Sequence, residues 1–217
     1  LPPEKRAPFN MLNMLNMLRA FGTLLSNVKF MALTFIGAMG MASFFAFLAT
    51  SSFLYMDYFG LSSFQYSLAF AVNALGFFSA SQLAANFEKR YGAIVVIKWA
   101  VAGFCTSACT LFVMVYLGFD SFRLLVVMLV CTYAFLGLVL PTSMVLALED
   151  HGPIAGTASA LGGTLQMMTG AAAIAVVSAA TTITPMLLVT TIAFCALVAV
   201  GLSLLALVVP ATTQGST

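Results

Sequence analysis

Six continuous apolar runs in the sequence are each long enough for a helix to cross a lipid bilayer. A hydrocarbon core about 30 Å thick needs about 20 residues of helix, and a helix satisfies its own backbone polar groups there. Barrel strands would instead alternate apolar and polar residues. The runs therefore predict an all-α polytopic membrane protein with six transmembrane helices. The expected spans are Met31–Tyr55, Gln65–Asn86, Ile94–Leu117, Arg123–Leu148, Pro153–Ala180 and Pro185–Val209.

The composition supports the same class of protein. Of the 217 residues, 62% are hydrophobic and only 6% are charged, and the mean hydropathy is +1.10. A soluble domain carries about 25% charged residues, because its surface must be solvated. This composition excludes disorder, collagen and coiled coil, and it predicts a lipid bilayer as the environment with no nucleic acid as a partner.

The basic residues indicate the orientation of the spans. By the positive-inside rule, Lys and Arg accumulate in short cytoplasmic loops. One membrane face carries only Arg123, so the other face, with both termini and the Glu149–His151 loop, is predicted to be cytoplasmic. The polar start Leu1–Arg6 does not resemble a cleavable signal peptide. The cytoplasmic set is Lys5, Arg6, Arg19, Lys29, Lys89, Arg90 and Lys98.

The segment before the first span has its own pattern. Asn10, Asn13, Asn16 and Arg19 recur every three residues between Met and Leu pairs, which predicts an amphipathic helix at the membrane interface. The expected organisation is therefore a cytoplasmic segment at 1–30, a six-helix bundle at 31–209 and a cytoplasmic tail at 210–217.

No pattern predicts an enzyme. His151 has no Gly-x-Ser-x-Gly elbow to serve, and the chain contains no phosphate-binding Gly-x-x-x-x-Gly-Lys-Ser/Thr loop. The four cysteines all fall inside spans and lack metal-ligand spacing, so we expect buried free thiols. We predict no catalytic residue, no cofactor and no metal. The cysteines are Cys105, Cys109, Cys131 and Cys195.

Polar residues inside the spans are the stronger functional signal. Polar groups at membrane depth face a bundle interior or a watery cavity, or they form interhelical hydrogen bonds, and the sequence leaves both alternatives open. The abundant aromatic residues could together line a cavity for aromatic or cationic compounds. The polar set comprises Thr50, Ser51, Ser52, Asn73, Gln82, Thr132, Tyr133 and Gln166.

Acidic residues are placed in loops or at the ends of spans. A proton-coupled carrier normally needs a titratable group within the membrane. Coupling is therefore expected in another segment or polypeptide, unless the protein is a uniporter or does not transport. The acidic residues in question are Asp57, Glu88, Asp120, Glu149 and Asp150.

Two spans carry features suited to movement. Pro141, four residues after Gly137, removes a backbone hydrogen bond and is expected to kink the fourth span. Ridges of small residues in the fifth span favour close packing or a sliding interface. These ridges are Gly162, Gln166 and Gly170, and Ala155, Ser159 and Gly163.

Loop charges suggest a gate. Lys89 and Arg90 are expected on the same membrane face as Glu149 and Asp150, so an ion pair between these loops could latch the cytoplasmic ends. The alternative is an ordinary positive-inside signal, with acids favouring a helix N-terminus. Replacing Glu149 with Lys should slow transport, and adding Arg90→Glu should restore it.

Short motifs occur in a particular order along nearly the whole chain. The most specific is Ala155–Leu161 followed by Leu165-Gln166. Ala85–Gly92 is a degenerate second-half form of the loop motif Gly-x-x-x-Asp-Arg-x-Gly-Arg-Lys. This order resembles the C-terminal half of a major facilitator superfamily transporter, of the Bcr/CflA-type drug-resistance group of drug:proton antiporters. The other matching segments are Leu1–Arg6, Tyr58–Ser62, Asn73–Gly76, Ser81–Leu83 and Arg90–Gly92.

The resemblance implies that the spans are helices seven to twelve of a twelve-helix carrier, and that residues 8–30 belong to its central loop. It implies a multidrug exporter of the bacterial inner membrane, a small hydrophobic or cationic drug-like substrate, and an N-terminal six-helix half as partner. It also implies that helices seven, eight, ten and eleven line the cavity. The residues it favours are Phe47, Ser51, Tyr55, Asn73, Phe77, Tyr133 and Gln166.

Two other functions stay open. The chain could be a non-transporting membrane protein that pairs with a partner or regulates a full-length carrier. It could also be a half-size transporter that works as a homodimer, because the repeats of such carriers can be separate chains.

Overall fold

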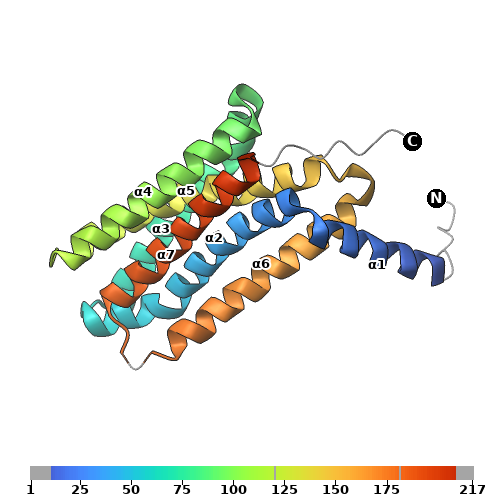
Figure 1. Ribbon diagram of the computed structural model, residues 1–217. Coiled ribbons are helices and arrows are strands. Elements are labelled where there is room, and N and C mark those ends of the chain that lie inside the picture. Colours follow the sequence, from blue (N-terminus) through green and yellow to red (C-terminus); the bar gives the residue numbers. More distant parts are fainter. Residues whose placement is uncertain (1–10, 120, 181, 209–217) are drawn as a thin grey trace, which may run out of the picture.

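The computed structural model describes residues 11–119, 121–180 and 182–208 (Figure 1). Asp120, the expected tail and the first ten residues, Asn10 included, lie outside this range. The described residues form helices and turns with no strand. The elements are α1 (Met11–Ser26), α2 (Val28–Ser52), the π-helix η1 (Phe53–Tyr58), α3 (Ser63–Tyr91), α4 (Ala93–Tyr116), α5 (Phe122–Glu149), the 3₁₀ turn η2 (Gly152–Ile154), α6 (Ala155–Ser178) and α7 (Pro185–Val208).

The six predicted spans are confirmed. Helices α2 to α7, with η1 and η2, supply six stretches that are long and apolar enough to cross a membrane. The main difference is α3, which was expected to end at Asn86 and instead continues to Tyr91. It stops where Gly92 adopts a φ of +84°, a backbone conformation that glycine tolerates. Lys89 and Arg90 therefore belong to the last turn of α3 rather than to a loop, where basic side chains favour the helix C-terminus.

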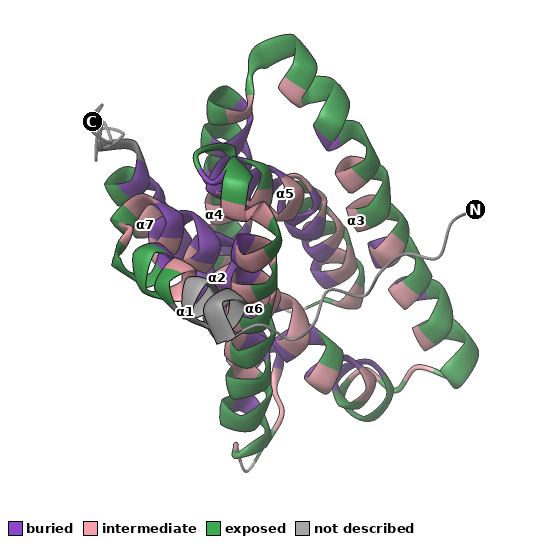
Figure 2. Ribbon diagram, turned by 90° about the vertical axis from the view of Figure 1, so that its right-hand side faces the viewer, coloured by how far each residue is buried: buried purple, intermediate pink, exposed green. Residues whose placement is uncertain are grey.

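The six long helices pack in two layers. Contacts run from α3 to α5, from α5 to α2 and from α2 to α6, so these four helices form a row. Behind the row, α4 packs on α5 and α7, and α7 packs on α2. Figure 2 shows α3 at the edge of the bundle and largely exposed, while buried residues gather in the helices nearer the centre.

Glycines permit the closest approaches within the row. A Cβ added at Gly137 of α5 would lie 2.3 Å from the carbonyl oxygen of Phe77, so the backbones of α5 and α3 are nearly in contact there. A Cβ at Gly37 of α2 would lie 2.6 Å from Nε2 of Gln166 and 2.9 Å from Oγ of Ser143. These two positions set the spacing of α2, α3, α5 and α6.

The two small-residue ridges of α6 have different environments. In the first ridge, a Cβ added at Gly170 would meet the ring of Phe45, and one at Gly162 would lie 3.7 Å from Thr34, so this ridge packs on α2. In the second ridge, nothing lies within 4 Å of a Cβ added at Gly163. The first ridge is therefore a packing surface within the bundle, and the second is half-buried, with open space at Gly163.

Pro141 lies inside a continuous helix, since α5 runs from Phe122 to Glu149 without interruption. The cysteines are free thiols, but the expectation that all are buried is wrong. Cys195 is buried and Cys131 is exposed. The physical reason is that lipid is as apolar as a protein core, so an apolar side chain in a membrane helix need not be covered by protein.

Helix α1 runs away from the bundle from its junction with α2 (Figure 1). It occupies the segment for which the sequence predicts an interfacial helix, although the side chains of Asn13 and Asn16 lie outside the described part of the structure. The turn between the helices is made by Asn27, whose Oδ1 accepts a hydrogen bond from the amide of Phe30 at 3.0 Å. Asn27 is therefore the N-cap of α2.

Candidate functional site

A largely enclosed cavity of about 210 Å³ lies among α2, α3 and α5. Its walls are almost entirely aromatic, with one amide side chain. Four of the residues expected to line a substrate cavity, Phe47, Asn73, Phe77 and Tyr133, are brought together here from three helices. The other lining residues are Phe44, Phe70, Ala74 and Phe78.

Ring-to-ring contacts hold the walls of this cavity. Phe44 of α2 stacks on Phe77 of α3 with centroids 5.6 Å apart, and Phe47 stacks on Phe70 at 6.0 Å. Tyr133 of α5 contacts both Phe44 and Phe47, at 5.9 and 5.2 Å. Aromatic pairs in such geometry stabilise a structure by about 1 kcal/mol beyond the area they bury. The cavity is thus bordered by rings that are already positioned.

The polar groups of the cavity differ in how well they are satisfied. The hydroxyl of Tyr133 donates to the carbonyl oxygen of Ser43 at 3.2 Å, which links α5 to α2. Asn73 is only 3% exposed, and its Nδ2 donates to the carbonyl of Ala69 at 3.1 Å. Its Oδ1 has no hydrogen-bond partner. Leaving a buried polar group unpaired costs about 1–3 kcal/mol, and the buried hydroxyl of Tyr55, which is also unpaired, interacts with the same amide side chain.

Ser51 and Tyr55 lie beyond the cavity, toward the end of the bundle formed by η1. The Oγ of Ser51 lies 3.3 Å from the hydroxyl of Tyr66. Tyr55 is fully buried, its ring contacts Phe47 at 6.2 Å and Phe122 at 5.5 Å, and its hydroxyl is unpaired. The ring of Tyr55 therefore packs behind the aromatic wall of the cavity, and neither Ser51 nor Tyr55 is part of its lining.

Gln166 lies elsewhere. It sits on α6, against Gly37 of α2 and near Ser143 of α5, so α2 separates it from α3. Gln166 is not among the residues that line the cavity with Asn73, and its place in a cavity between two bundles stays a prediction. Its amide instead occupies the packing surface between α6 and α2. The sequence could place Gln166 on a helix face but could not say which neighbour that face meets.

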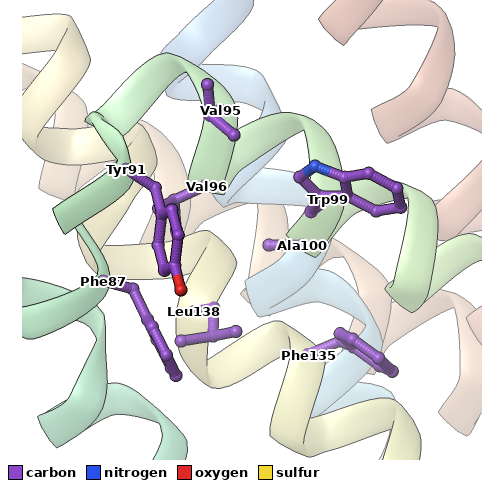
Figure 3. Close-up of a pocket in the computed structure, with 8 residues that line it drawn as sticks. All are labelled: Phe87, Tyr91, Val95, Val96, Trp99, Ala100, Phe135 and Leu138. Atoms are coloured by element: carbon purple, nitrogen blue, oxygen red, sulfur yellow. The ribbon is translucent and has the colours of Figure 1, made fainter.

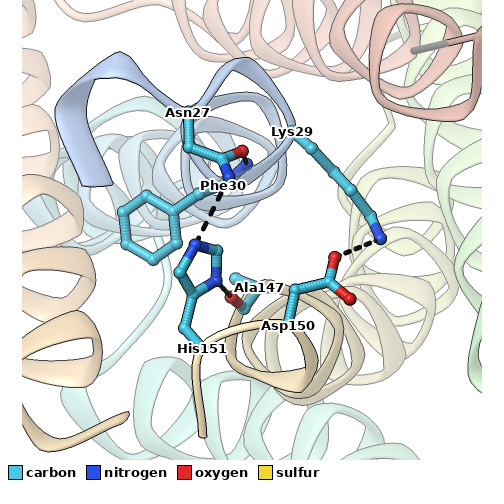
Figure 4. A network of polar contacts seen from close by, with 6 residues as sticks. All are labelled: Asn27, Lys29, Phe30, Ala147, Asp150 and His151. Carbon is cyan, nitrogen blue, oxygen red and sulfur yellow. Dashed lines mark hydrogen bonds and ion pairs between the residues drawn. The ribbon is translucent and has the colours of Figure 1, made fainter. Parts of the chain in front are cut away.

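The end of the bundle at which α2 begins and α3 and α5 end carries Lys29, Lys89, Arg90 and Lys98, and we call it the basic end. Here the Nζ of Lys29 forms an ion pair with Oδ2 of Asp150 at 2.6 Å (Figure 4). It is the only ion pair within the described ranges. Asp150 thus pairs with Lys29, no ion pair within the described ranges joins Lys89 or Arg90 to Glu149 or Asp150, and the latch between these residues in an outward-facing state stays a prediction.

His151 completes a network at the same end (Figure 4). Its Nδ1 lies 3.1 Å from the carbonyl oxygen of Ala147, which can only accept, so Nδ1 carries the proton and donates. Its Nε2 then accepts from Nδ2 of Asn27 at 3.3 Å, and its ring meets Phe30 edge to face at 5.4 Å. The network ties the start of α2 to the end of α5.

Glu88 is the acidic residue that the sequence placed least accurately. It lies within α3, and its Oε1 accepts a hydrogen bond from the hydroxyl of Thr142 at 2.7 Å. Thr142 is buried in α5, next to Pro141. A carboxylate therefore reaches α5 inside its last two turns. The contact between Glu88 and Thr142 could not have been found from the sequence. The role of Asn27 could have been, because an Asn directly before an apolar run is a signal of a helix N-cap.

Comparison with known proteins gives one informative relative. The chain is 29% identical over 175 residues to the uncharacterized MFS-type transporter YdgK of Bacillus subtilis, a match that covers 78% of this chain and 41% of the relative. No family model matches the chain. No solved structure matches it either. The chain thus spans about two fifths of that relative's length, and the six apolar helices, together with this similarity, are those of a multi-pass membrane protein.

Proposed function

We propose that this chain forms one six-helix half of a secondary transporter that exports small hydrophobic or cationic compounds. The observation that carries the proposal is a cavity walled by aromatic rings from three helices. Aromatic faces attract flat apolar and cationic groups. The cavity is therefore suited to aromatic compounds that carry a positive charge.

The need for a second bundle is supported by α3 and α6. They have the lowest mean hydropathy of the six spans, 1.4 and 1.5, against 2.5 for α5 and α7. They are also the least covered, since α3 buries only Ala69, Asn73 and Ala84. Lipid would favour the opposite relation, with the most apolar helices facing outward. The open faces of α3 and α6 are therefore suited to contact with another protein segment or with water.

In the proposed arrangement this half is the C-terminal one, and the other half lies against the α3–α5–α2–α6 row with the substrate between the two. Carriers built from such repeats bind substrate near the midplane and rock the halves about it. The basic end faces the cytoplasm of the bacterial inner membrane, because seven of eight basic residues belong to that side. A homodimer of this chain would satisfy the same open faces.

Transport assays on everted membrane vesicles test this function. We expect energised vesicles containing the protein to accumulate ethidium, an aromatic cation with amino donors. Phe77→Ala should raise the KM for ethidium about tenfold, because an aromatic wall that contacts the cation is lost, and Asn73→Ala should raise it less, because the amide oxygen of Asn73 is buried. The matched control is Phe194→Ala, since Phe194 is 64% exposed on α7 of the other layer.

A wild-type protein that does not transport ethidium or related cations contradicts the proposal. Equal effects of Phe77→Ala and Phe194→Ala would contradict the assignment of the cavity. Thermal unfolding of each purified variant separates a lost contact from a lost fold, because a variant with an unchanged melting temperature has kept the bundle.

We further propose that export is driven by a proton gradient through acidic groups outside this chain. Adding ethidium to energised vesicles should then release protons, which an entrapped pH dye measures. Glu88→Gln keeps an oxygen that can accept from Thr142 but removes the charge. Substrate-driven proton release should persist in this variant. Loss of proton release in Glu88→Gln would make Glu88 the coupling group and would contradict the proposal that the coupling acids lie outside this chain.

A further inference from the structure

A second pocket, of about 300 Å³, lies between α3 and α4 with α5 as its floor. Figure 3 shows Phe87 and Tyr91 on one side of it and Trp99 on the other, with Phe135 and Leu138 from α5 below. Its lining contains no charged residue and consists of aliphatic and aromatic side chains. The remaining lining residues are Val95, Val96 and Ala100.

The pocket lies at the depth of lipid acyl chains. Trp99 follows the α3–α4 turn at Gly92 by seven positions, which is about 10 Å along a helix. Trp99 is 74% exposed and Tyr91 is 53% exposed, and both residue types favour the boundary between headgroups and hydrocarbon. The pocket therefore begins near the headgroups and continues toward the hydrocarbon core.

Basic side chains surround the mouth of the pocket. The guanidinium of Arg90 lies 5.3 Å from the ring centroid of Tyr91, so it sits directly on the pocket wall. Lys98 follows Val95 by three positions and therefore lies beside it on α4. Lys89 and Arg90 are exposed, as is Lys98, and within the described ranges none of the three has a carboxylate within 4 Å. This positive rim disfavours a cationic compound and favours an anion.

We propose that this pocket binds an anionic phospholipid, with one acyl chain between α3 and α4 and its phosphate at Arg90 and Lys98. An apolar slot with an unpaired basic rim at the membrane surface matches a molecule that has a long hydrocarbon chain and a negative headgroup. The binding is independent of transport, since the pocket is separate from the cavity that contains Asn73.

The chain carries its own probe for this site, because Trp99 is its only tryptophan. The chain is reconstituted in vesicles of phosphatidylcholine containing brominated phosphatidylglycerol, and in matched vesicles containing brominated phosphatidylcholine, since bromine on an acyl chain quenches indole fluorescence at short range. Each basic residue near an anionic surface contributes about fivefold to binding. We expect phosphatidylglycerol to quench at a mole fraction about 25-fold lower than phosphatidylcholine, about fivefold for each of Arg90 and Lys98.

Charge-neutralising variants test the rim. Arg90→Gln and Lys98→Gln should each reduce the preference for phosphatidylglycerol about fivefold, and the double variant should abolish it. Lys29→Gln is the matched control, because Lys29 is also at the basic end but pairs with Asp150 and does not line the pocket. Its preference should equal that of the wild type.

Three outcomes would overturn the proposal. Equal quenching by the two lipids would identify ordinary contact with the surrounding bilayer. A preference that survives in the double variant would show that this rim does not select the lipid. A preference that falls equally in Lys29→Gln would show that net charge rather than this rim selects the lipid. Absence of quenching by both lipids would mean that another protein segment covers the pocket.

Discussion

The central helices α2 and α5 and the flanking helices α3 and α6 are all long enough to span a membrane, yet they are covered very differently. Helix α2 buries fourteen of its 25 residues, whereas α6 buries only Ala158, Gly162, Gly170 and Val177. The flanking helices are also the less apolar of the two pairs. In this bundle the helices that neighbouring protein covers least are therefore the least apolar ones, which is the reverse of what exposure to lipid would favour. The comparison instead identifies the faces of α3 and α6 as surfaces for protein or water.

The strongest test of the central packing is Gly137→Ala. The added Cβ would lie 2.3 Å from the carbonyl oxygen of Phe77, and a backbone atom cannot move aside as a side chain end can. We expect a loss of about 3 kcal/mol in the free energy of unfolding, measured by denaturation in detergent micelles. Gly163→Ala is the control, since nothing lies within 4 Å of its new Cβ. Equal stability of the two variants would mean that α3 and α5 are not in close contact.

The flanking surface is tested by Gly163→Leu. This change should leave the melting temperature of the chain unchanged or slightly raised, because Leu favours helix more than Gly does. If a second bundle packs on this ridge of α6, ethidium transport should fall about tenfold, as expected for the loss of a small-residue helix interface. Unchanged transport would show that this ridge faces lipid. The result separates stability of the bundle from assembly.

The next effect concerns the start of the central helix α2. Asn27→Ala removes the cap on the amide of Phe30 and the contact with His151, so we expect a loss of about 1 kcal/mol. Asn27→Ser keeps a capping oxygen but is too short to maintain the same contact with His151. Thermal unfolding should place Asn27→Ser between the wild type and Asn27→Ala. If both variants match the wild type, the network at the basic end does not stabilise the bundle.

The smallest effect is expected from the ion pair that joins α2 to the end of α5. Lys29 and Asp150 are 26% and 43% exposed, so water and salt screen their attraction. A double-mutant cycle with Lys29→Met and Asp150→Asn should give a coupling of about 0.5 kcal/mol, and it should decline as salt is raised. A coupling of several kcal/mol would instead make the Lys29–Asp150 pair the latch that holds the basic end closed.

The candidate site could be predicted in part. Phe47, Asn73, Phe77 and Tyr133 were selected from the sequence and do line one cavity. They could be selected because a polar or aromatic residue in an apolar span is conspicuous by itself. Gln166 is equally conspicuous, yet it packs against Gly37 on the far side of α2. What distinguishes it is the rotation of α6 about its axis, which depends on its neighbours.

The basic end shows the same limit. The sequence suggested an ion pair between Lys89 or Arg90 and Glu149 or Asp150. In the structure Asp150 pairs with Lys29, and Glu88 accepts a hydrogen bond from the hydroxyl of Thr142. Each of these pairs joins residues more than 50 positions apart in the chain. A charge pattern shows which groups share a membrane face, and only packing brings two of them within hydrogen-bond distance.

The sequence by itself determined that this protein is an all-helical membrane protein with six spans, because the length and apolarity of each span and the internal hydrogen bonding of a helix are local properties. The tertiary structure alone decided that α3, α5, α2 and α6 form a row, that Asn73 lies among aromatic rings with its Oδ1 unpaired, and that Trp99 borders a pocket beneath a basic rim. These features arise from contacts between distant helices, and the close approach at glycines such as Gly137 sets how those helices meet.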